Sequence, residues 1–98
     1  MRYEILFAPE AVRDFKHLKA HTRSEVKNAI ETHLRHEPTK LSKSRIKRLR
    51  KMIQPQYRLR VGNDIRVFYD VTGDSVEVLA IVSKSETSEW LKERGTPS

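Results

Sequence analysis

The stretch that decides the fold is YRLRVGNDIRVFYDV, which runs from Tyr57 to Val71. Apolar side chains alternate with polar ones on both sides of the Gly62-Asn63 pair, and a period of two residues is typical of β-strands. Glycine and asparagine tolerate the positive φ angles of a tight turn. The stretch therefore predicts a β-hairpin that carries Arg58, Arg60 and Arg66 on one face, opposite the apolar side chains.

The chain downstream of this hairpin predicts another strand and a helix. Gly73-Asp74 marks a second turn, and residues 75–83 are apolar at nearly every position, as in a central strand covered on both faces. Ser83 or Ser85 is suited to cap a short helix that includes Trp90 and Leu91. We expect an antiparallel three-stranded meander followed by a short C-terminal helix.

The chain upstream of the hairpin predicts a strand and two helices. Residues 2–7 alternate like a strand, and Pro9 stands where the first turn of a helix tolerates proline, so we expect a helix over 9–20. Residues 22–25 form a capping-box sequence for a second helix that ends before Pro38. The fold class is α+β: N-terminal strand, α-helical hairpin, meander and C-terminal helix, in one domain of residues 1–98.

Residues 39–55 leave two interpretations open. Apolar side chains are spaced among many basic residues, which fits a lone amphipathic helix or a loop with one extended piece. Pro55 ends either structure.

The charge of the chain is concentrated in one block. The 98 residues carry a formal net charge of +7, and residues 40–66 hold ten Lys and Arg against one acid, Asp64. Such a block favours a polyanion, either a nucleic acid or a very acidic protein segment. We expect RNA to contact the basic side chains of this block and the ring of Phe68, which lies on the arginine face and can stack on a base; the basic residues are Lys43, Arg45, Lys47, Arg48, Arg50 and Lys51.

The residue types exclude several kinds of site. The chain has no cysteine, no carboxylate pair at ligand spacing and only three glycines, so we expect no disulfide, metal, cofactor or phosphate-loop site. No apolar run approaches the length of a membrane span, and we expect a cytoplasmic protein. Cleavage of RNA by its own 2′-hydroxyl needs no metal, and arginine suits such a reaction because it binds phosphate through two parallel hydrogen bonds.

The whole pattern resembles the toxins of the RelE/ParE superfamily. Residues 57–71 are similar to their signature of tyrosine–basic–x–basic, a turn, then arginine–apolar–x–tyrosine, and the resemblance extends to residues 8–11, 15–18 and 46–49. It implies a RelE-like fold and the toxin of a type II toxin–antitoxin system. RelE-like members are mRNA interferases, endoribonucleases that cut mRNA on the ribosome without a metal and inhibit translation. The implied partners are the ribosome with its mRNA and an acidic antitoxin encoded alongside.

The resemblance also implies a catalytic set. Arg58 and Arg60 stand where the family has two basic residues that act on the phosphate and as candidate base, and Arg66 matches the arginine on the scissile phosphate. After the last strand the family carries an arginine and then a tyrosine or histidine, where this chain has Ser85 and Leu91. Lys84 and Trp90 stand next to these positions, so Lys84 is expected to supply charge and Trp90 to stack on RNA. Two alternatives stay open: a gyrase inhibitor like the ParE branch, and a module without activity that binds only antitoxin or RNA.

Overall fold

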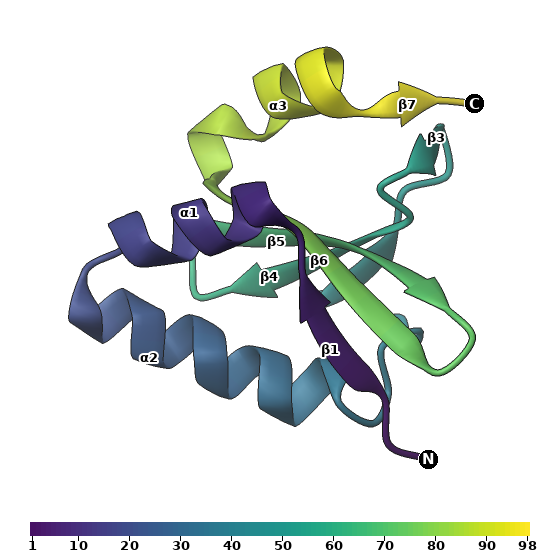
Figure 1. The fold of residues 1–98 in the computed structure, drawn as a ribbon. Helices are drawn as coiled ribbons and strands as arrows, with labels where there is room; N and C mark the ends of the chain where they lie inside the picture. Colours follow the sequence, from purple (N-terminus) through teal and green to yellow (C-terminus); the bar gives the residue numbers. More distant parts are fainter.

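Five strands form one mixed sheet with the order β1-β6-β5-β4-β2 (Figure 1). The computed structural model describes residues 1–98. The elements of the main sheet are β1 (Glu4–Phe7), β2 (Ile46–Arg48), β4 (Tyr57–Val61), β5 (Ile65–Thr72) and β6 (Ser75–Ser83). A separate pair consists of β3 (Met52–Gln54) and β7 (Thr96–Pro97). The helices are α1 (Pro9–His17), α2 (Ala20–Ala29), which continues as a π-helical turn (Ile30–Leu34), and α3 (Thr87–Arg94), which follows a 3-10 turn (Lys84–Glu86).

The predicted antiparallel meander is confirmed as β4, β5 and β6. Gly62 and Gly73 lie in its two turns with φ of 60°, the left-handed region that glycine adopts without steric cost. The sheet gains two strands by pairings of distant segments: β1 lies parallel to β6, and β2 lies antiparallel to β4. These pairings place the basic segment before β4 on an edge of the sheet.

The main core fills the space between α1, α2 and one face of the sheet. Val26, Ile30 and Leu34 of the second helix belong to the same buried cluster as Leu59 and Val67 of the sheet. Alternation within each strand directs these apolar side chains to one face and the arginines to the other. The hydrophobic core therefore fixes which way the arginines point.

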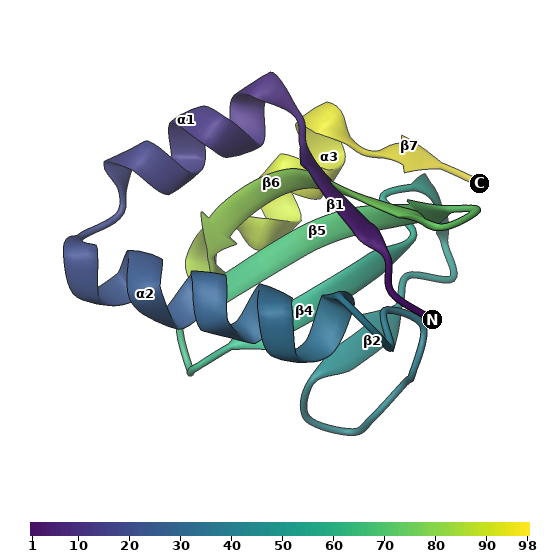
Figure 2. The same cartoon turned by 60° about the horizontal axis from the view of Figure 1, so that its bottom comes forward.

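Helix α3 lies against the opposite face of the sheet. Figures 1 and 2 show α2 and α3 on either side of β4, β5 and β6. The ring of Phe68 is buried on this second face, outside the main core, and Trp90 of α3 covers it. The central strands are therefore covered on both faces, as the continuous apolar run of β6 predicts.

The helix boundaries differ from the prediction at three places. Leu18 and Lys19 are extended, with ψ of 151° and 152°, so α1 ends at His17 rather than Ala20. Helix α2 then begins at Ala20, so the capping-box sequence at 22–25 lies within the helix and does not begin it. The π-helical turn ends the hairpin at Leu34, before Glu37. Sequence alone located the break between the helices to within three residues, because the capping-box sequence at 22–25 is a local signal that the observed helix start at Ala20 does not use.

Of the two interpretations of residues 39–55, the loop is confirmed and the helix is wrong, but the loop has two extended pieces, β2 and β3, where one was expected. Ser83 is the cap of the last helical segment: its hydroxyl donates to Glu86 Oε1 at 2.7 Å, and the backbone N–H of Ser83 donates to the same carboxylate. None of the helices has the length and apolar character that crossing a membrane requires.

Candidate functional site

Strands β4 and β5 bring three arginines together on the sheet face opposite α1 and α2, called here the arginine face. Arg60 pairs directly with Arg66 across the two strands, and Arg58 pairs with Phe68, two residues further along β5. Like charges on adjacent strands destabilise a sheet. The fold therefore maintains a concentration of positive charge at a cost in stability.

Arg58 lies at the centre of this charge. Its Nε is buried and has no hydrogen-bond partner. Burial lowers the pKa of Arg58, and the neighbouring charges of Arg66 and Arg60 lower it further. The guanidinium makes no hydrogen bond within the protein and has two positive neighbours, so its terminal N–H groups are suited to bind an anion.

Arg60 and Arg66 are held by the turn between their strands. Arg60 Nε donates to the carbonyl of Gly62 at 3.0 Å, and its Nη2 donates to Oδ1 of Asn63 at 3.0 Å. Arg66 is only 5% exposed, and its Nη1 donates to the carbonyls of Ile65 and Asn63. Burial and the charge of Arg60 lower the pKa of Arg66. The three arginines share a face as predicted, but Arg66 is buried rather than displayed.

Lys84 directly follows β6, the strand that pairs with the arginine-bearing strand β5. Its backbone N–H donates to the carbonyl of Asp64 at 2.5 Å, one turn residue before β5, and its side chain is exposed. Ser85 lies next to it, with its hydroxyl 3.2 Å from that of Ser83, and Leu91 is partly buried in α3. Lys84 is thus the cationic side chain that follows the last strand.

The basic segment divides over two sides of the sheet. Lys47 pairs with Arg58 across β2 and β4, so both belong to the arginine face. Arg48 belongs to the other side, where it lies 5.1 Å over the Tyr57 ring and donates to the carbonyl of Gln56. The other four candidates are exposed on the flanking loops, namely Lys43 and Arg45 before β2 and Arg50 and Lys51 after it. Only Lys47 of this set is placed on the arginine face by strand register.

Phe68 does not offer its ring face to RNA in this structure, contrary to the prediction, and one face of the Trp90 ring covers it. Phe68 is 1% exposed, and the two rings stack on each other with 5.0 Å between centroids and 16° between planes. Trp90 is fixed further by its Nε1, which donates to Glu10 at 2.8 Å. The apolar requirement of α3, which must bury Trp90 somewhere, explains why the rings pair with each other.

Glu10 is a residue whose role the sequence did not reveal. Its carboxylate in the first turn of α1 accepts from Trp90 and also forms an ion pair with Arg94, so it ties α3 to α1 across 80 and 84 positions of the chain. In the sequence it is one of two acids that suit a helix N-terminus, and that local role needs no partner. The structure has no group of three or more His, Cys, Asp or Glu side chains that would suit a metal ion.

Comparisons with known proteins agree on one family of folds. The family model described as "ParE toxin of type II toxin-antitoxin system, parDE" matches residues 5–87. The toxin–antitoxin complex RelBE2 from Mycobacterium tuberculosis is similar with a TM-score of 0.72 and 22% identity, over 86% of this chain and 100% of that one. The RelB–RelE complex from Methanococcus jannaschii has a TM-score of 0.66 and 29% identity, over 87% of this chain and 96% of that one. The RelE–RelB complex from Pyrococcus horikoshii has a TM-score of 0.69 and 22% identity, over 86% of this chain and 97% of that one. No curated protein matches the sequence.

Proposed function

The chain belongs to the family of ParE toxins of type II toxin–antitoxin systems, within the RelE/ParE superfamily, and we propose that it is an mRNA endoribonuclease that cuts transcripts on the ribosome without a metal ion. The observation that carries this proposal is the arginine face, where Arg58 keeps an unpartnered donor beside Arg60 and Arg66. Such a site fits the extra negative charge that a phosphate gains during cleavage.

The proposed reaction uses the 2′-hydroxyl of the RNA as nucleophile. That oxygen attacks the adjacent phosphorus, and the bond from phosphorus to the 5′-oxygen of the next nucleotide breaks. The products are a 2′,3′-cyclic phosphate and a 5′-hydroxyl. Arg58 and Arg66 bind the phosphate oxygens, since a guanidinium keeps its charge and donates in pairs. Arg60 and Lys84 add charge beside them.

Proton transfer is the part of the reaction that arginines serve poorly, because they stay protonated. The two lysines next to the arginine face in the sheet are Lys47, which pairs with Arg58 across β2 and β4, and Lys84, whose backbone N–H donates to the carbonyl of Asp64. A neutral amine can accept the proton of the 2′-hydroxyl, and water can supply the proton that the leaving 5′-oxygen takes up. We propose that the exposed basic side chains around β2 hold the RNA, namely Lys43, Arg45, Lys47, Arg48, Arg50 and Lys51, while the arginine face holds the scissile phosphate.

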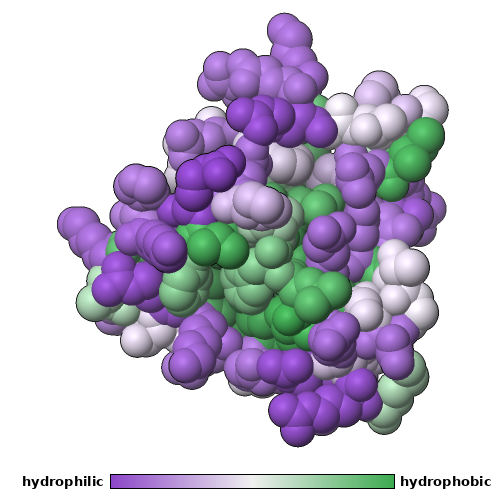
Figure 3. Space-filling view, viewed as in Figure 1, coloured by the Kyte–Doolittle hydropathy of each residue, from purple (hydrophilic) through white to green (hydrophobic).

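The proposed protein partner is an acidic antitoxin, and the proposed compartment is the cytoplasm, where translating ribosomes lie. A groove of about 450 Å³ lies between α1, α2 and β1, and apolar side chains of Phe7, Val12, Phe15 and Ile30 line it. Figure 3 shows this apolar area surrounded by hydrophilic side chains. Lys16, Lys27 and Arg35 also line the groove, against one acid, Glu31. An antitoxin segment with apolar and acidic residues is complementary to it.

Induction of the toxin in growing cells tests the nuclease. Mapping of transcript 5′ ends is expected to reveal new discrete ends together with a fall in translation, and Arg66→Ala is expected to lose both. Arg13→Ala is the matched control, because Arg13 is an exposed arginine on α1, away from the arginine face. Equal harmlessness of the wild type and Arg66→Ala would contradict the proposal.

A second candidate is inhibition of DNA gyrase, which the name of the matched ParE family model favours. It predicts DNA damage signalling and filamentous cells with transcripts left intact. The same induced cultures separate the two functions, because the nuclease produces cut transcripts before any DNA damage response. A chain that binds its antitoxin but causes neither effect would be an inactive binding module.

A further inference from the structure

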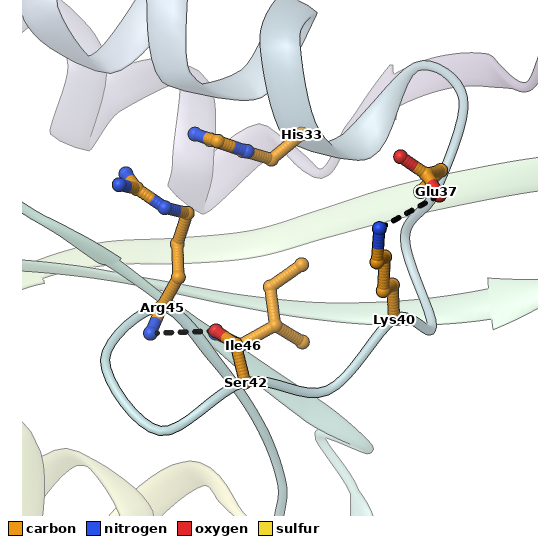
Figure 4. Close-up of a pocket in the computed structure, with 6 residues that line it drawn as sticks. All are labelled: His33, Glu37, Lys40, Ser42, Arg45 and Ile46. Atoms are coloured by element: carbon orange, nitrogen blue, oxygen red, sulfur yellow. Dashed lines mark hydrogen bonds and ion pairs between the residues drawn. The ribbon is translucent and has the colours of Figure 1, made fainter.

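A polar pocket lies on the far side of β2 from the arginine face, and of its lining residues the proposed function uses only Arg45. It lies between the π-helical turn that ends α2 and the loop that leads into β2, and its volume is about 190 Å³. Figure 4 shows its lining side chains directed around a common space: His33, Glu37, Lys40, Ser42, Arg45 and Ile46. Five of these six residues are polar.

The pocket contains donors that the protein itself leaves unused. Arg45 makes hydrogen bonds through its backbone alone: its N–H donates to Ser42 Oγ at 3.0 Å, and its carbonyl accepts from Arg60. Ser42 Oγ accepts this bond and so keeps its own hydroxyl hydrogen free to donate. The ring of His33 has no hydrogen-bond partner in the structure. Guanidinium, imidazole and hydroxyl are the groups that bind phosphate in proteins.

The charge of the pocket is also suited to an anion. Lys40 Nζ lies 3.5 Å from Glu37, so these two charges offset each other. Arg45 then leaves the pocket positive, and protonation of His33 makes it more so. Burial lowers the pKa of His33, and the charge of Arg45 lowers it further, so the imidazole carries less charge until an anion arrives. The other charged groups that line the pocket with His33 are Glu37 and Lys40.

The position of the pocket connects it to the arginine face. The carbonyl of Arg45 accepts a hydrogen bond from the N–H of Arg60 at 2.8 Å. The next residue, Ile46, lines the pocket, and the one after it, Lys47, pairs with Arg58 on the arginine face. One narrow edge strand therefore separates the two sites, and the exposed basic loop of Lys43 borders both.

We propose that this pocket binds a backbone phosphate of RNA, as a second contact beyond the scissile phosphate, through Arg45, His33 and Ser42. RNA is favoured over an acidic protein segment because residues 40–63 between the pocket and the arginine face contain no acid and seven Lys and Arg before β4. A nucleic-acid strand that crosses the edge of β2 meets positive charge along its whole path. This inference rests on the proposed function for the identity of the anion and for the contact of Arg45 with RNA, and it adds a defined phosphate site with His33 and Ser42.

Titration of the histidines by NMR tests the pocket with inorganic phosphate. Phosphate is expected to raise the pKa of His33, because an anion stabilises the protonated imidazole. The ring resonances of His17 at constant pH are expected to stay in place, because His17 is exposed on α1, outside the pocket. In Arg45→Ala the His33 pKa is expected to be higher before phosphate is added, and the response to phosphate is expected to disappear. No response of His33 in the wild-type chain would overturn the proposal.

Binding of a single-stranded RNA oligonucleotide at several salt concentrations tests the assignment to RNA. Arg45→Ala is expected to weaken binding about tenfold and to reduce the slope of log affinity against log salt by about 0.7, the value for one phosphate contact to a single strand. Arg45→Lys keeps the charge and is expected to keep the slope, and Arg13→Ala is the matched control. Because Arg45 is exposed, thermal unfolding of these variants is expected to match that of the wild type.

The outcomes separate this inference from the nuclease. If Arg45→Ala binds RNA with wild-type affinity and slope, the pocket does not bind RNA, even if transcripts are cut and phosphate still moves His33. If RNA binding depends on Arg45 and phosphate raises the pKa of His33, but transcripts stay intact in cells, the nuclease is wrong and the pocket stands.

Discussion

The indole of Trp90 lies nearly parallel to the ring of Phe68, with 5.0 Å between the ring centroids. This stack joins α3 to the sheet face that carries the arginines. The indole is held at a second point, because Trp90 Nε1 donates a hydrogen bond to the carboxylate of Glu10. The C-terminal helix therefore covers the apolar part of that face and leaves the arginines beside it. The contact between Trp90 and Phe68 therefore marks where the covered part of this face ends and the arginine-bearing part begins.

Trp90→Ala is expected to destabilise the protein by about 3 kcal/mol, the lower end for loss of a large aromatic side chain, because Trp90 is only partly buried. The substitution removes the stack and one hydrogen bond together. Urea unfolding followed by circular dichroism measures the change. Glu89→Ala, at the exposed neighbouring position, is expected to change stability by less than about 0.5 kcal/mol. Equal effects of the two variants would mean that the stack does not hold α3.

Arg58→Met is expected to raise the free energy of unfolding by about 1 kcal/mol while abolishing toxicity. Methionine fills the path of the arginine stem, and the change removes an unpartnered buried Nε and the repulsion from Arg60 and Arg66. Thermal unfolding and growth after induction are measured on the same variant. A variant that is both destabilised and toxic would show that Arg58 has a structural role instead.

Asp14→Asn is expected to remove part of the pH dependence of the free energy of unfolding. Burial raises the pKa of Asp14 above its ordinary value of 3.8, although the N–H of Ile81, which donates to Oδ2 at 2.9 Å, partly opposes this. The folded chain therefore holds this proton more tightly than the unfolded chain, so stability falls as pH rises from 3.8 through the raised pKa. Asparagine accepts the same hydrogen bond without charge. Melting temperatures measured from about pH 3 to about pH 7 are expected to favour the variant increasingly as pH rises; parallel curves would contradict the account.

Tyr69→Phe is expected to cost about 1–2 kcal/mol of stability. The buried hydroxyl donates to the carbonyl of Pro38 at 2.6 Å, which ties the loop after α2 to β5, and its removal leaves that carbonyl unpaired. Burial raises the pKa of Tyr69 strongly, so the hydroxyl stays protonated and the bond persists in alkaline solution. Urea unfolding of Tyr69→Phe and of Tyr3→Phe makes the comparison, because the hydroxyl of Tyr3 has no partner in the structure. A loss as large in Tyr3→Phe would rule out the hydrogen bond as the cause.

The sequence predicts the parts of the fold that depend on neighbours in the chain. The meander over 57–83 is readable because alternation and the two glycine turns are local signals, and the shared face of Arg58, Arg60 and Arg66 follows from the same alternation. The parallel pairing of β1 with β6 and the edge position of β2 were not predicted, since both depend on contacts between distant segments.

In the candidate site too, the features that depend on local sequence were predictable and those that depend on distant contacts were not. The positions of the arginines were predictable, but the burial of Phe68 was not, because it depends on where α3 docks. That docking uses the contact of Trp90 with Glu10, and no local pattern connects residues 80 positions apart. The pocket around His33 was missed for the same reason, since its lining comes from a helix end and a loop that the sequence left unassigned.

Cleavage of mRNA by the purified protein on programmed ribosomes tests the central claim most directly. Primer extension across the message, with chemical analysis of the new ends, is compared for the wild type, Arg66→Ala and Arg13→Ala. The account predicts discrete cuts with a 5′-hydroxyl and a 2′,3′-cyclic phosphate for the wild type and Arg13→Ala, and none for Arg66→Ala. Intact message with the wild-type chain, or cuts of equal strength with Arg66→Ala, would contradict it.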